Sequence, residues 1–472
     1  MKIKPFSSLR SLTRMEWMLC GLFFLTHAIA YFFILEEAPF FGDERHYDRN
    51  AELLLRYIDG PSAFRQSISY HLVGAGYFMP FYSVLIVPFK WLELSDGMIR
   101  GVNLFINIGL SLWMVVLIRR MFDRLIANIF LALMAMLPIL VLFDLTIFPE
   151  ATAGKLVLLT LLLFYQFSST EWSNRRCFYF TICASLLILF RQSAVFIFLP
   201  MTLYYLFFNW MPDRGWKSIV RLIKFCLPST IIVASAIVFW SGMLSDKFGP
   251  GYITTTSTDL SFMVLWGEGF DKLGNQAYPS IWRRLHEHYF HKSQREKTTF
   301  KEAVSEDKKR VLNNLTWNKY LTGLKRNIST FLSFKGGKIG YIIRRAKGNR
   351  YKPMIDRLQY WNWFVCVFCV LTIGLVTVFP SVIQANYQRC LGLILFAMPF
   401  LMIHIFVARA NSRHGLLLWW TLVFLAAIVS AQFVKYLKNK NNIRKSTDPG
   451  IQLGRIWIMI FMLILLAVTV FV

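Results

Sequence analysis

Several charged residues of this chain lie beside long apolar stretches, where a charge is costly and usually has a partner or a task. Asp43 and Glu44 are adjacent in FFGDERHYDR, directly after the first apolar run. Arg100 begins the second run, and Arg191 lies between LLILF and AVFIF. A carboxylate can take a proton from an attacking hydroxyl, and Arg binds phosphate with two parallel hydrogen bonds. These residue types favour a reaction between a hydroxyl and a phosphate-bearing molecule.

Further charges are expected on the same side of the membrane as Asp43. Asp144 and Glu150 bracket the turn between the third and fourth runs, and Arg409 and Arg413 follow the ninth. Each Arg has a second interpretation, in which its charged head extends to the membrane interface without any functional role. The two interpretations have about equal weight for an Arg considered alone.

The spacing of apolar residues after Asp43 predicts a helix with one apolar face, formed by Tyr47, Ala51, Leu54 and Ile58. Asp43, four residues before Tyr47, is expected on that apolar face, and Glu44 on the other side. An Asp at the start of a helix also serves as an N-cap, because its side chain accepts a backbone N–H. Asp43 is therefore either a helix cap or a carboxylate with a chemical role.

The elements that must position these residues are membrane spans. The chain has 472 residues, of which 56% are hydrophobic and 17% are charged, whereas soluble proteins are about a quarter charged. Apolar runs of about 20 residues recur, which is the length a helix needs to cross the bilayer. The sequence predicts an all-α polytopic membrane protein with about 11 spans. They are 17–35, 99–118, 125–143, 151–168, 178–190, 192–209, 225–243, 361–380, 390–408, 415–434 and 456–472.

The distribution of Lys and Arg predicts which way the spans run. Basic short loops fall on the same side as the N-terminus, which the positive-inside rule places inside. The loop at 36–98 and the polar insert at 244–356 are then external. The chain divides into a membrane module (1–243), the insert (244–356) and a second membrane module (357–472). The apolar stretch 77–92 is broken by proline and predicts one interfacial or re-entrant helix.

The net charge of +26 and the seven cysteines exclude some classes of protein. Much of the charge flanks apolar runs, which indicates membrane orientation and no nucleic acid partner. The cysteines lie in or beside apolar runs, so they predict no disulfide framework, and Cys366 and Cys369 favour packing over zinc. The histidines of RRLHEHYFHK (283–292) leave a metal site open, although a solvated helix face is the better interpretation.

The stretch PFFGDERHYDRNAELLL (39–55) resembles the first external loop of the GT-C glycosyltransferases. These polyprenol-phosphate-sugar enzymes include protein O-mannosyltransferases and the aminoarabinose transferases of lipid A. The resemblance continues in 97–123, which has Arg at its outer end and Arg-Arg at its inner end, and in 143–164, where an acidic residue opens a span. It covers the N-terminal part of the chain. The insert at 244–356 departs from the pattern, because many family members place their soluble domain at the C-terminus.

The resemblance implies an integral membrane enzyme that moves a sugar from a polyprenyl-phosphate carrier to a glycan, lipid or protein acceptor. The reaction is expected on the external face of the membrane, and we expect that membrane to be a bacterial inner membrane. We assign the catalytic role to Asp43 as general base with Glu44 beside it. The other assignments are Arg191, Arg100, Arg409 and Arg413 to the donor phosphate, Asp144 and Glu150 as supporting carboxylates, and Tyr47 and His46 to the substrate side. No cofactor is implied with certainty, and a divalent metal ion is left open.

Two other functions are consistent with parts of the sequence. An O-antigen polymerase or ligase is also polytopic, with a large external loop and essential arginines, but needs no Asp-Glu pair in the first loop. A lipid or glycan transporter would carry charges near the middle of the bilayer and paired repeats with broken helices. No repeat is visible in this chain, and its charges are expected at the outer edge, so the transporter is the least favoured.

Overall fold

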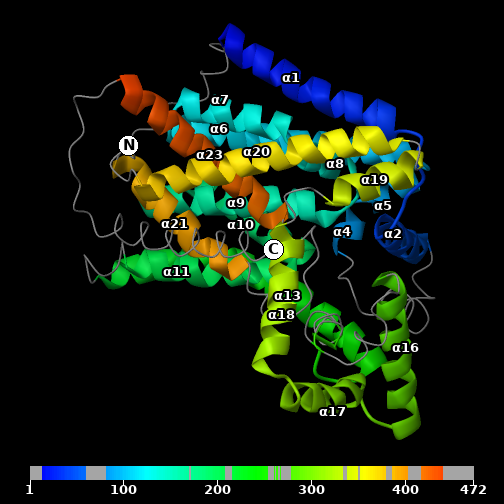
Figure 1. The fold of residues 1–472 in the computed structure, drawn as a ribbon. Coiled ribbons are helices and arrows are strands. Elements are labelled where there is room, and N and C mark those ends of the chain that lie inside the picture. The colour runs from blue at the N-terminus through cyan, green and yellow to red at the C-terminus, as the bar shows by residue number, and fades with distance from the viewer. Residues whose placement is uncertain are drawn as a thin grey trace.

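A computed structural model of the protein describes residues 13–59, 81–169, 172–207, 215–252, 260, 262–263, 266, 278–332, 337–348, 351–378, 385–401 and 416–438. Every regular element in these ranges is a helix, which confirms the predicted all-α class. The longer helices lie side by side and form a bundle, beside which the insert forms a smaller group (Figure 1).

The bundle consists of helices that follow the predicted spans in order. They are α1 (Arg14–Ala30) with η2 (Tyr31–Leu35), α6 (Asp96–Met121), α7 (Arg124–Met136), α8 (Pro138–Leu145), α9 (Pro149–Ser169), α10 (Asn174–Phe190), η5 (Gln192–Ile197), α11 (Phe198–Tyr205), α13 (Trp216–Phe248), α20 (Lys352–Val378), α21 (Ala385–Leu401) and α23 (Leu416–Lys438). Local capping explains several of their ends. The Ser95 side chain accepts the Met98 N–H at 3.3 Å, and Asp123 accepts that of Ile126 at 2.9 Å.

The predicted number of spans is not confirmed. In the described ranges, 5 helices are long and apolar enough to cross a membrane, or up to 6 if the pair α7 and α8, bent by 74°, forms one span. The predicted span 456–472 lies outside the described residues. The bend falls at Pro138, the first residue of α8, and a proline at this position begins a new helix without losing a hydrogen bond.

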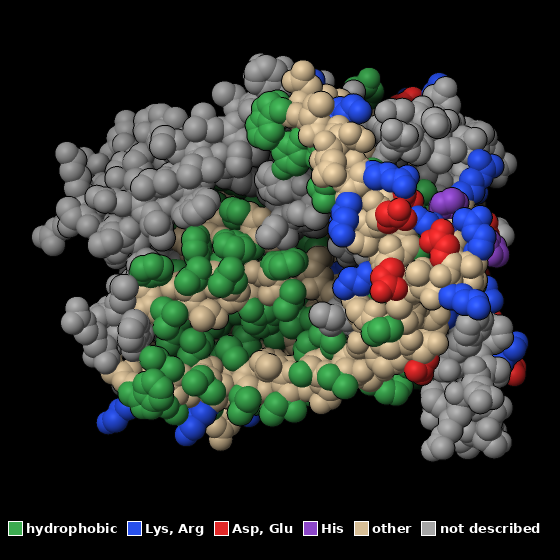
Figure 2. Space-filling model, turned by 90° about the horizontal axis from the view of Figure 1, so that it is seen from below, with side chains coloured by type: hydrophobic (Ala, Val, Ile, Leu, Met, Phe, Trp, Pro, Cys, Tyr) green, Lys and Arg blue, Asp and Glu red, His purple; other side chains and the backbone are tan. Residues whose placement is uncertain are grey.

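Burial separates the central helices from those that face lipid. The apolar windows of α9 and α23 are 94% and 83% buried, whereas those of α1 and α13 are 28% and 22% buried. Seen from below, hydrophobic side chains cover one broad face, and charged side chains gather on a separate part of the surface (Figure 2). A helix that is apolar all round and buried belongs to the centre of a bundle, so α9 is the helix around which the others pack.

One end of the bundle carries ion pairs from the predicted inner loops. Glu16 on α1 lies 3.6 Å from Arg119 and 3.7 Å from Arg124, and Lys435 on α23 lies 2.5 Å from Asp123. The opposite end contains the last residues of η2 and α10, the first residues of α6 and α9, and the loop that joins η2 to α6. Asp43, Glu44, Arg100, Glu150 and Arg191 all belong to this second end.

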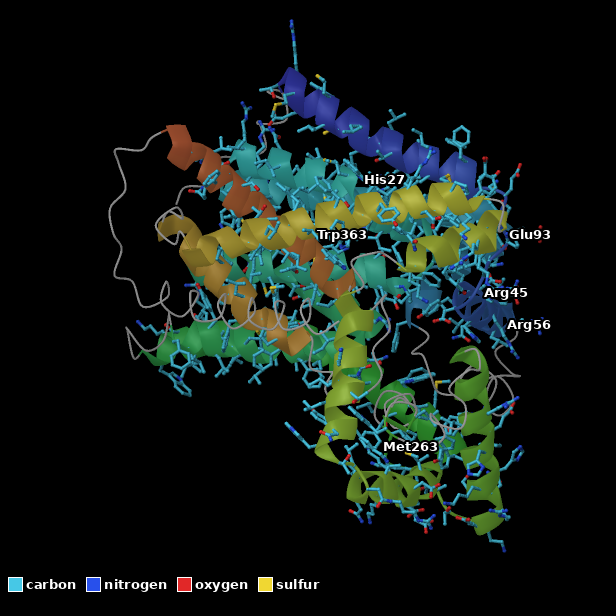
Figure 3. The ribbon with its side chains drawn as sticks, in the orientation of Figure 1. His27, Arg45, Arg56, Glu93, Met263 and Trp363 are labelled. Carbon is cyan, nitrogen blue, oxygen red and sulfur yellow. The ribbon has the colours of Figure 1, made fainter. Side chains whose placement is uncertain are left out.

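The loop between η2 and α6 forms α2 (Glu44–Asp59), α4 (Phe81–Val84) and α5 (Val87–Trp91). The single helix predicted for 77–92 is wrong in its described part, because Pro88 lies in the first turn of α5 and divides the stretch into two helices. Lys90 of α5 forms an ion pair with Asp48 of α2 at 2.5 Å. This pair ties the two helices together at the end of the bundle where Figure 3 labels Arg45, Arg56 and Glu93.

The insert consists of α16 (Tyr278–Glu296), α17 (Phe300–Asn313), α18 (Trp317–Leu332) and α19 (Gly337–Lys347). The first two helices pack with the end of α13 around a second apolar core, to which Met263 also belongs (Figure 3). In the histidine motif, His286 packs on Phe290 and Phe300, and His288 and His291 are exposed. By contrast, α19 leaves this core and packs against η2, α8 and α20.

Candidate functional site

Glu44 lies at the end of the bundle that carries the loop between η2 and α6, which we call the loop end. It has no exposed surface. Its Oε1 accepts from Arg100 Nε at 3.1 Å and from the Ile147 N–H at 2.9 Å. Its Oε2 accepts from Arg100 Nη2 at 2.6 Å and from the Phe41 N–H at 3.1 Å. Both carboxylate oxygens are therefore fully used, in the paired geometry that suits a carboxylate and a guanidinium.

Arg100 is equally buried, and it holds the chain that enters the loop. Besides the two bonds to Glu44, its Nη1 donates to the carbonyls of Leu35, at 3.3 Å, and Ala38, and its Nη2 donates to that of Pro39 at 2.9 Å. A guanidinium has five N–H donors, and all five have protein acceptors here. In this arrangement Arg100 offers nothing to a donor phosphate, and its geometry is that of a residue that positions the loop.

The sequence predicts Asp43 on the apolar face of the helix and Glu44 on the other side, and the structure has the reverse. Glu44 is the fully buried carboxylate, and Asp43 is half-buried. The Asp43 carbonyl accepts the N–H groups of His46 and Tyr47 at 3.0 and 3.2 Å, so Asp43 occupies the cap position before α2. The prediction that Glu44 lies on the outer side of the helix is wrong, because the chain turns at Gly42 and the helical pattern does not extend back through Asp43.

Gly42 makes this turn with φ at +57°, a conformation that favours glycine. A Cβ added there would lie 2.5 Å from Oη of Tyr341 on α19. We expect Gly42→Ala to lower the free energy of unfolding by about 1–3 kcal/mol, because it adds backbone strain and a close contact.

The measurement is thermal unfolding of the purified full-length variant in detergent. Gly109→Ala on α6 is the matched control, since a Cβ at Gly109 meets nothing within 4 Å. Equal unfolding temperatures in Gly42→Ala and Gly109→Ala would show that Tyr341 and the loop adjust freely.

A second buried group lies deeper, between α1, α6, α8, α9 and α23. Asp144 Oδ1 accepts from Lys155 Nζ, and Asp144 Oδ2 lies 3.3 Å from His27 Nε2. Lys155 also donates to Asn107 Oδ1 at 3.0 Å, and its ammonium lies 4.3 Å from the centre of the Trp420 ring. Figure 3 places His27 on the side of α1 that faces the bundle. A buried charge that is paired and hydrogen-bonded in this way is tolerated inside a bundle.

This group fixes the turn between α8 and α9. Asn103 Nδ2 donates to the carbonyls of Asp144 and Thr146 at 3.2 and 2.9 Å, and Asn107 Nδ2 donates to the Asp144 carbonyl at 3.2 Å. The same turn supplies the Ile147 N–H that binds Glu44. The Asp144 carboxylate is fully buried and bound to Lys155, and the Asp144 carbonyl is held by Asn103 and Asn107. Asp144 therefore helps to fix this turn.

Glu150 opens α9 directly after this turn and pairs with Arg191. Glu150 is fully buried, whereas the Arg191 side chain is 16% exposed. Arg191 lies where α10 ends, with an extended backbone (φ −144°, ψ 92°), and the short helix η5 follows at once. Non-helical backbone at membrane depth occurs only where protein buries it or where it lines a cavity. Among Arg100, Lys155 and Arg191, only Arg191 has part of its side chain exposed, since the other two are fully buried.

Aromatic rings in edge-to-face contact connect the loop to the residue before Arg191. The Tyr47 ring centre lies 5.3 Å from that of Tyr82, which lies 5.1 Å from that of Phe190. Tyr47 is buried and so takes a packing position, whereas His46 is exposed. Because Tyr47 is one turn after Asp43 and Phe190 precedes Arg191, these contacts bring the start of α2 near the end of α10.

Tyr82 is a buried hydroxyl in the neighbourhood of these carboxylates. Burial raises the pKa of the Tyr82 hydroxyl, and the negative charges of Glu150, Glu44 and Asp144 raise it further, against a hydrogen bond with Thr152 that lowers it. The hydroxyl donates to Asn103 Oδ1 at 3.0 Å. Tyr82 is therefore a neutral hydrogen-bond donor surrounded by acidic residues.

The predicted site residues are thus brought together in part. Asp43, Glu44, Arg100, Asp144, Glu150 and Arg191 lie at one end of the bundle, whereas Arg409 and Arg413 lie outside the described residues. Sequence reasoning missed Lys155, His27 and Asn107, although a Lys within the apolar stretch TAGKLVLL was a usable signal. Within the described ranges no group of three or more His, Cys, Asp or Glu could hold a metal ion. The divalent metal ion that the sequence leaves open is not tested by this observation.

Comparisons with known proteins leave the family open. No protein-family model matches the chain, and no curated protein matches it. Among solved structures, the chain is similar to the archaeal oligosaccharyltransferase AglB from Archaeoglobus fulgidus, in complex with an inhibitory peptide and a dolichol-phosphate. The identity is 14% and the TM-score 0.44, over 97% of this chain and 55% of that chain. This chain thus spans about half the length of that protein, and a likeness this distant carries no argument about function.

Proposed function

We propose that the protein is a membrane glycosyltransferase that uses a polyprenyl-phosphate-linked sugar on the external face of the membrane. The observation that carries the proposal is the arrangement of two residues at the loop end of the bundle. Asp43 is half-buried on a loop that the Glu44–Arg100 pair holds in place, and Arg191, at the break after α10, keeps part of its side chain exposed. A carboxylate and an arginine on rigid supports suit the transfer of a phosphate-linked group.

In the proposed reaction, the acceptor hydroxyl attacks the sugar carbon that is bonded to the donor phosphate. Asp43 takes the hydroxyl proton while the new carbon–oxygen bond forms. The carbon–phosphate oxygen bond breaks, and the polyprenyl phosphate leaves with the bonding electrons. Arg191 stabilises the negative charge that builds on this phosphate. Glu150 orients the Arg191 guanidinium through their ion pair.

The lipid tail of the donor needs an apolar surface that reaches the site. We propose that it lies along α4 and α5, where Val84, Trp91 and Leu92 are 50%, 66% and 57% exposed. Tyr82 and Ile86 on the same stretch are buried toward the loop. This stretch therefore presents apolar groups on its outer side and joins the site on its inner side.

Arg191 is the residue on which the donor phosphate is expected to depend. Arg191→Lys keeps the charge but loses the planar pair of donors, so we expect donor affinity to fall by about tenfold or more. The measurement is equilibrium binding of a radiolabelled polyprenyl-phosphate sugar to purified protein. Arg124→Lys at the inner end is the matched control and should bind normally. Normal donor binding in both Arg191→Lys and Arg191→Ala would give this residue a structural role alone.

The function itself is tested with a panel of radiolabelled polyprenyl-phosphate sugars and purified full-length protein in lipid. Transfer or hydrolysis of one of these sugars is the expected result. No reaction with any of these sugars would favour the O-antigen polymerase or ligase. A transporter would move the intact lipid across sealed vesicles without breaking the sugar–phosphate bond. Either of these results would replace the proposed function.

A further inference from the structure

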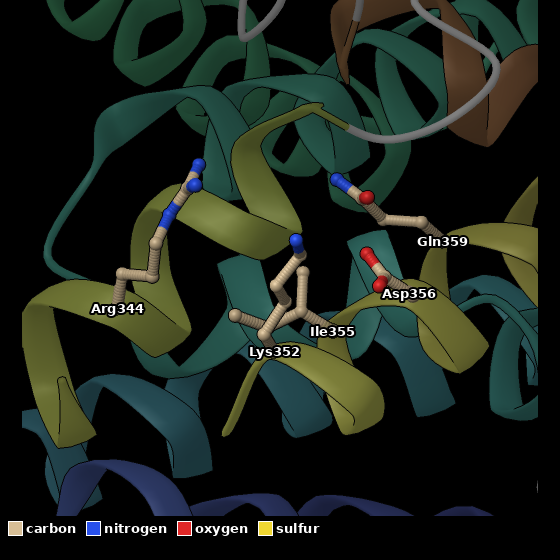
Figure 4. A pocket seen from close by; sticks show the side chains of 5 residues that line it. All are labelled: Arg344, Lys352, Ile355, Asp356 and Gln359. Atoms are coloured by element: carbon tan, nitrogen blue, oxygen red, sulfur yellow. The ribbon is translucent and has the colours of Figure 1, made fainter. Parts of the chain in front are cut away.

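A surface cavity with charged residues in its lining lies between α19 and α20, apart from the residues assigned to sugar transfer. Its volume is about 150 Å³, and it is lined by Arg344, Lys352, Ile355, Asp356 and Gln359 (Figure 4). This is several times the volume of one water molecule, about 30 Å³. The cavity is therefore large enough for the phosphate of a ligand together with neighbouring atoms.

The charges in this cavity are not balanced. In Figure 4 the Lys352 ammonium lies between the Arg344 guanidinium on one side and the Asp356 and Gln359 side chains on the other. Arg344 Nε donates to the Gly340 carbonyl at 3.0 Å, and the Arg344 side chain lines the cavity. Among the described ion pairs, none involves Lys352 or Asp356. Arg344, Lys352 and Asp356 are all exposed, so the cavity opens to the surface, and two cations against one carboxylate give it one net positive charge.

The position of the cavity along α20 indicates what kind of ligand can reach it. Aromatic side chains follow directly on the same helix, with Tyr360 71%, Trp361 44% and Trp363 44% exposed. Exposed Tyr and Trp at the end of an apolar span are typical of the membrane–water interface. Asp356 is four residues before Tyr360, which is about 6 Å along a helix. The cavity is therefore at the depth of the lipid headgroups.

We propose that this cavity binds the headgroup of an anionic phospholipid from the outer leaflet. The phosphodiester lies between Arg344 and Lys352, whose charges exceed that of Asp356 by one. A hydroxyl of the headgroup donates to Asp356, and the Gln359 amide donates to a phosphate oxygen. Phosphatidylglycerol has this combination of one negative charge and hydroxyl donors, whereas phosphatidylcholine has neither a net charge nor a donor.

Lipid binding at this place has a consequence for the first loop. The helix α19 carries both Arg344 and Tyr341, and Tyr341 packs on Gly42 beside Asp43. A lipid that joins α19 to α20 therefore helps to hold α19, with Tyr341, against the first loop. The inference does not depend on the proposed sugar transfer, because binding is measured without any donor.

The test uses full-length protein in nanodiscs of phosphatidylcholine that contain a photoreactive phosphatidylglycerol. Crosslinked peptides are identified by mass spectrometry. We expect labelling of the segment 344–359, reduced by about tenfold or more in the double variant Arg344→Gln/Lys352→Gln. Arg357→Gln is the matched control, since it removes one exposed charge from the same helix without lining the cavity. Asp356→Asn should reduce the preference for phosphatidylglycerol over phosphatidic acid, which lacks the headgroup hydroxyls.

Three results would overturn the proposal. Equal labelling in the double variant and in Arg357→Gln would mean that the surface charge alone attracts the lipid. Equal labelling by a photoreactive phosphatidylcholine would mean that the contact needs no anionic headgroup. No labelling of the segment 344–359 by the photoreactive phosphatidylglycerol, with labelling of other segments, would mean that no lipid headgroup enters the cavity.

Discussion

Asp43→Asn is expected to slow turnover by at least about a hundredfold, while the protein still folds, inserts and binds its lipid donor. A positioned general base contributes on the order of 10²–10⁴-fold in rate, and Asn cannot take the proton. The binding of donor should be nearly unchanged, because the phosphate depends on Arg191 and not on Asp43. The measurement is the initial rate of sugar transfer at saturating donor, together with donor affinity from equilibrium binding.

The same variant separates the two interpretations of Asp43. Asn caps a helix about as well as Asp, so a residue that only caps α2 predicts nearly normal turnover. Asp48 is unsuitable as a control, since it pairs with Lys90 at 2.5 Å and burial raises its pKa. Glu37→Gln is the better control, because its side chain in the same loop is 86% exposed and its pair with Lys347 is long, at 4.0 Å. Turnover above about a tenth of the wild-type value would leave Asp43 as a cap.

The helices of the bundle could be predicted from the sequence, because a long apolar run has one stable solution in a membrane. Each predicted span from 17–35 to 415–434 overlaps a helix. The shorter elements were harder to predict. The stretch 77–92 looks continuous in hydropathy, and only the placement of Pro88 in the first turn of α5 decides that two helices form there.

The site could be predicted only as a set of residues at one end of the bundle. Periodicity places Asp43 on the buried face of a helix, but a single turn at Gly42 gives that place to Glu44. Arg100 is a reasonable candidate for phosphate binding in the sequence, because a sequence does not show whether an arginine already has partners. Its partners, Glu44 and three backbone carbonyls, become visible only in the fold. Lys155 was missed for the same reason.

Arg100→Met should destabilise the protein strongly, because it leaves the fully buried Glu44 carboxylate without its cation. Removal of one partner of a buried ion pair typically costs about 3–5 kcal/mol. Three loop carbonyls also lose their donor, so the loss is expected to concentrate in the first loop. The measurement combines denaturant unfolding of the purified protein with protease sensitivity of the loop. Arg124→Met is the matched control, with a pair that is half-exposed and worth about 0–1 kcal/mol.

The double variant Arg100→Met/Glu44→Gln tests whether the cost comes from the isolated carboxylate. Gln has no charge, and its carbonyl oxygen can still accept the Ile147 N–H, so the double variant should be more stable than Arg100→Met alone. The interaction free energy in this cycle should be about 1–3 kcal/mol. A stable Arg100→Met protein that has lost donor binding would contradict the positioning role. It would return Arg100 to the donor phosphate, because only a residue that contacts the ligand can weaken binding without loosening the loop.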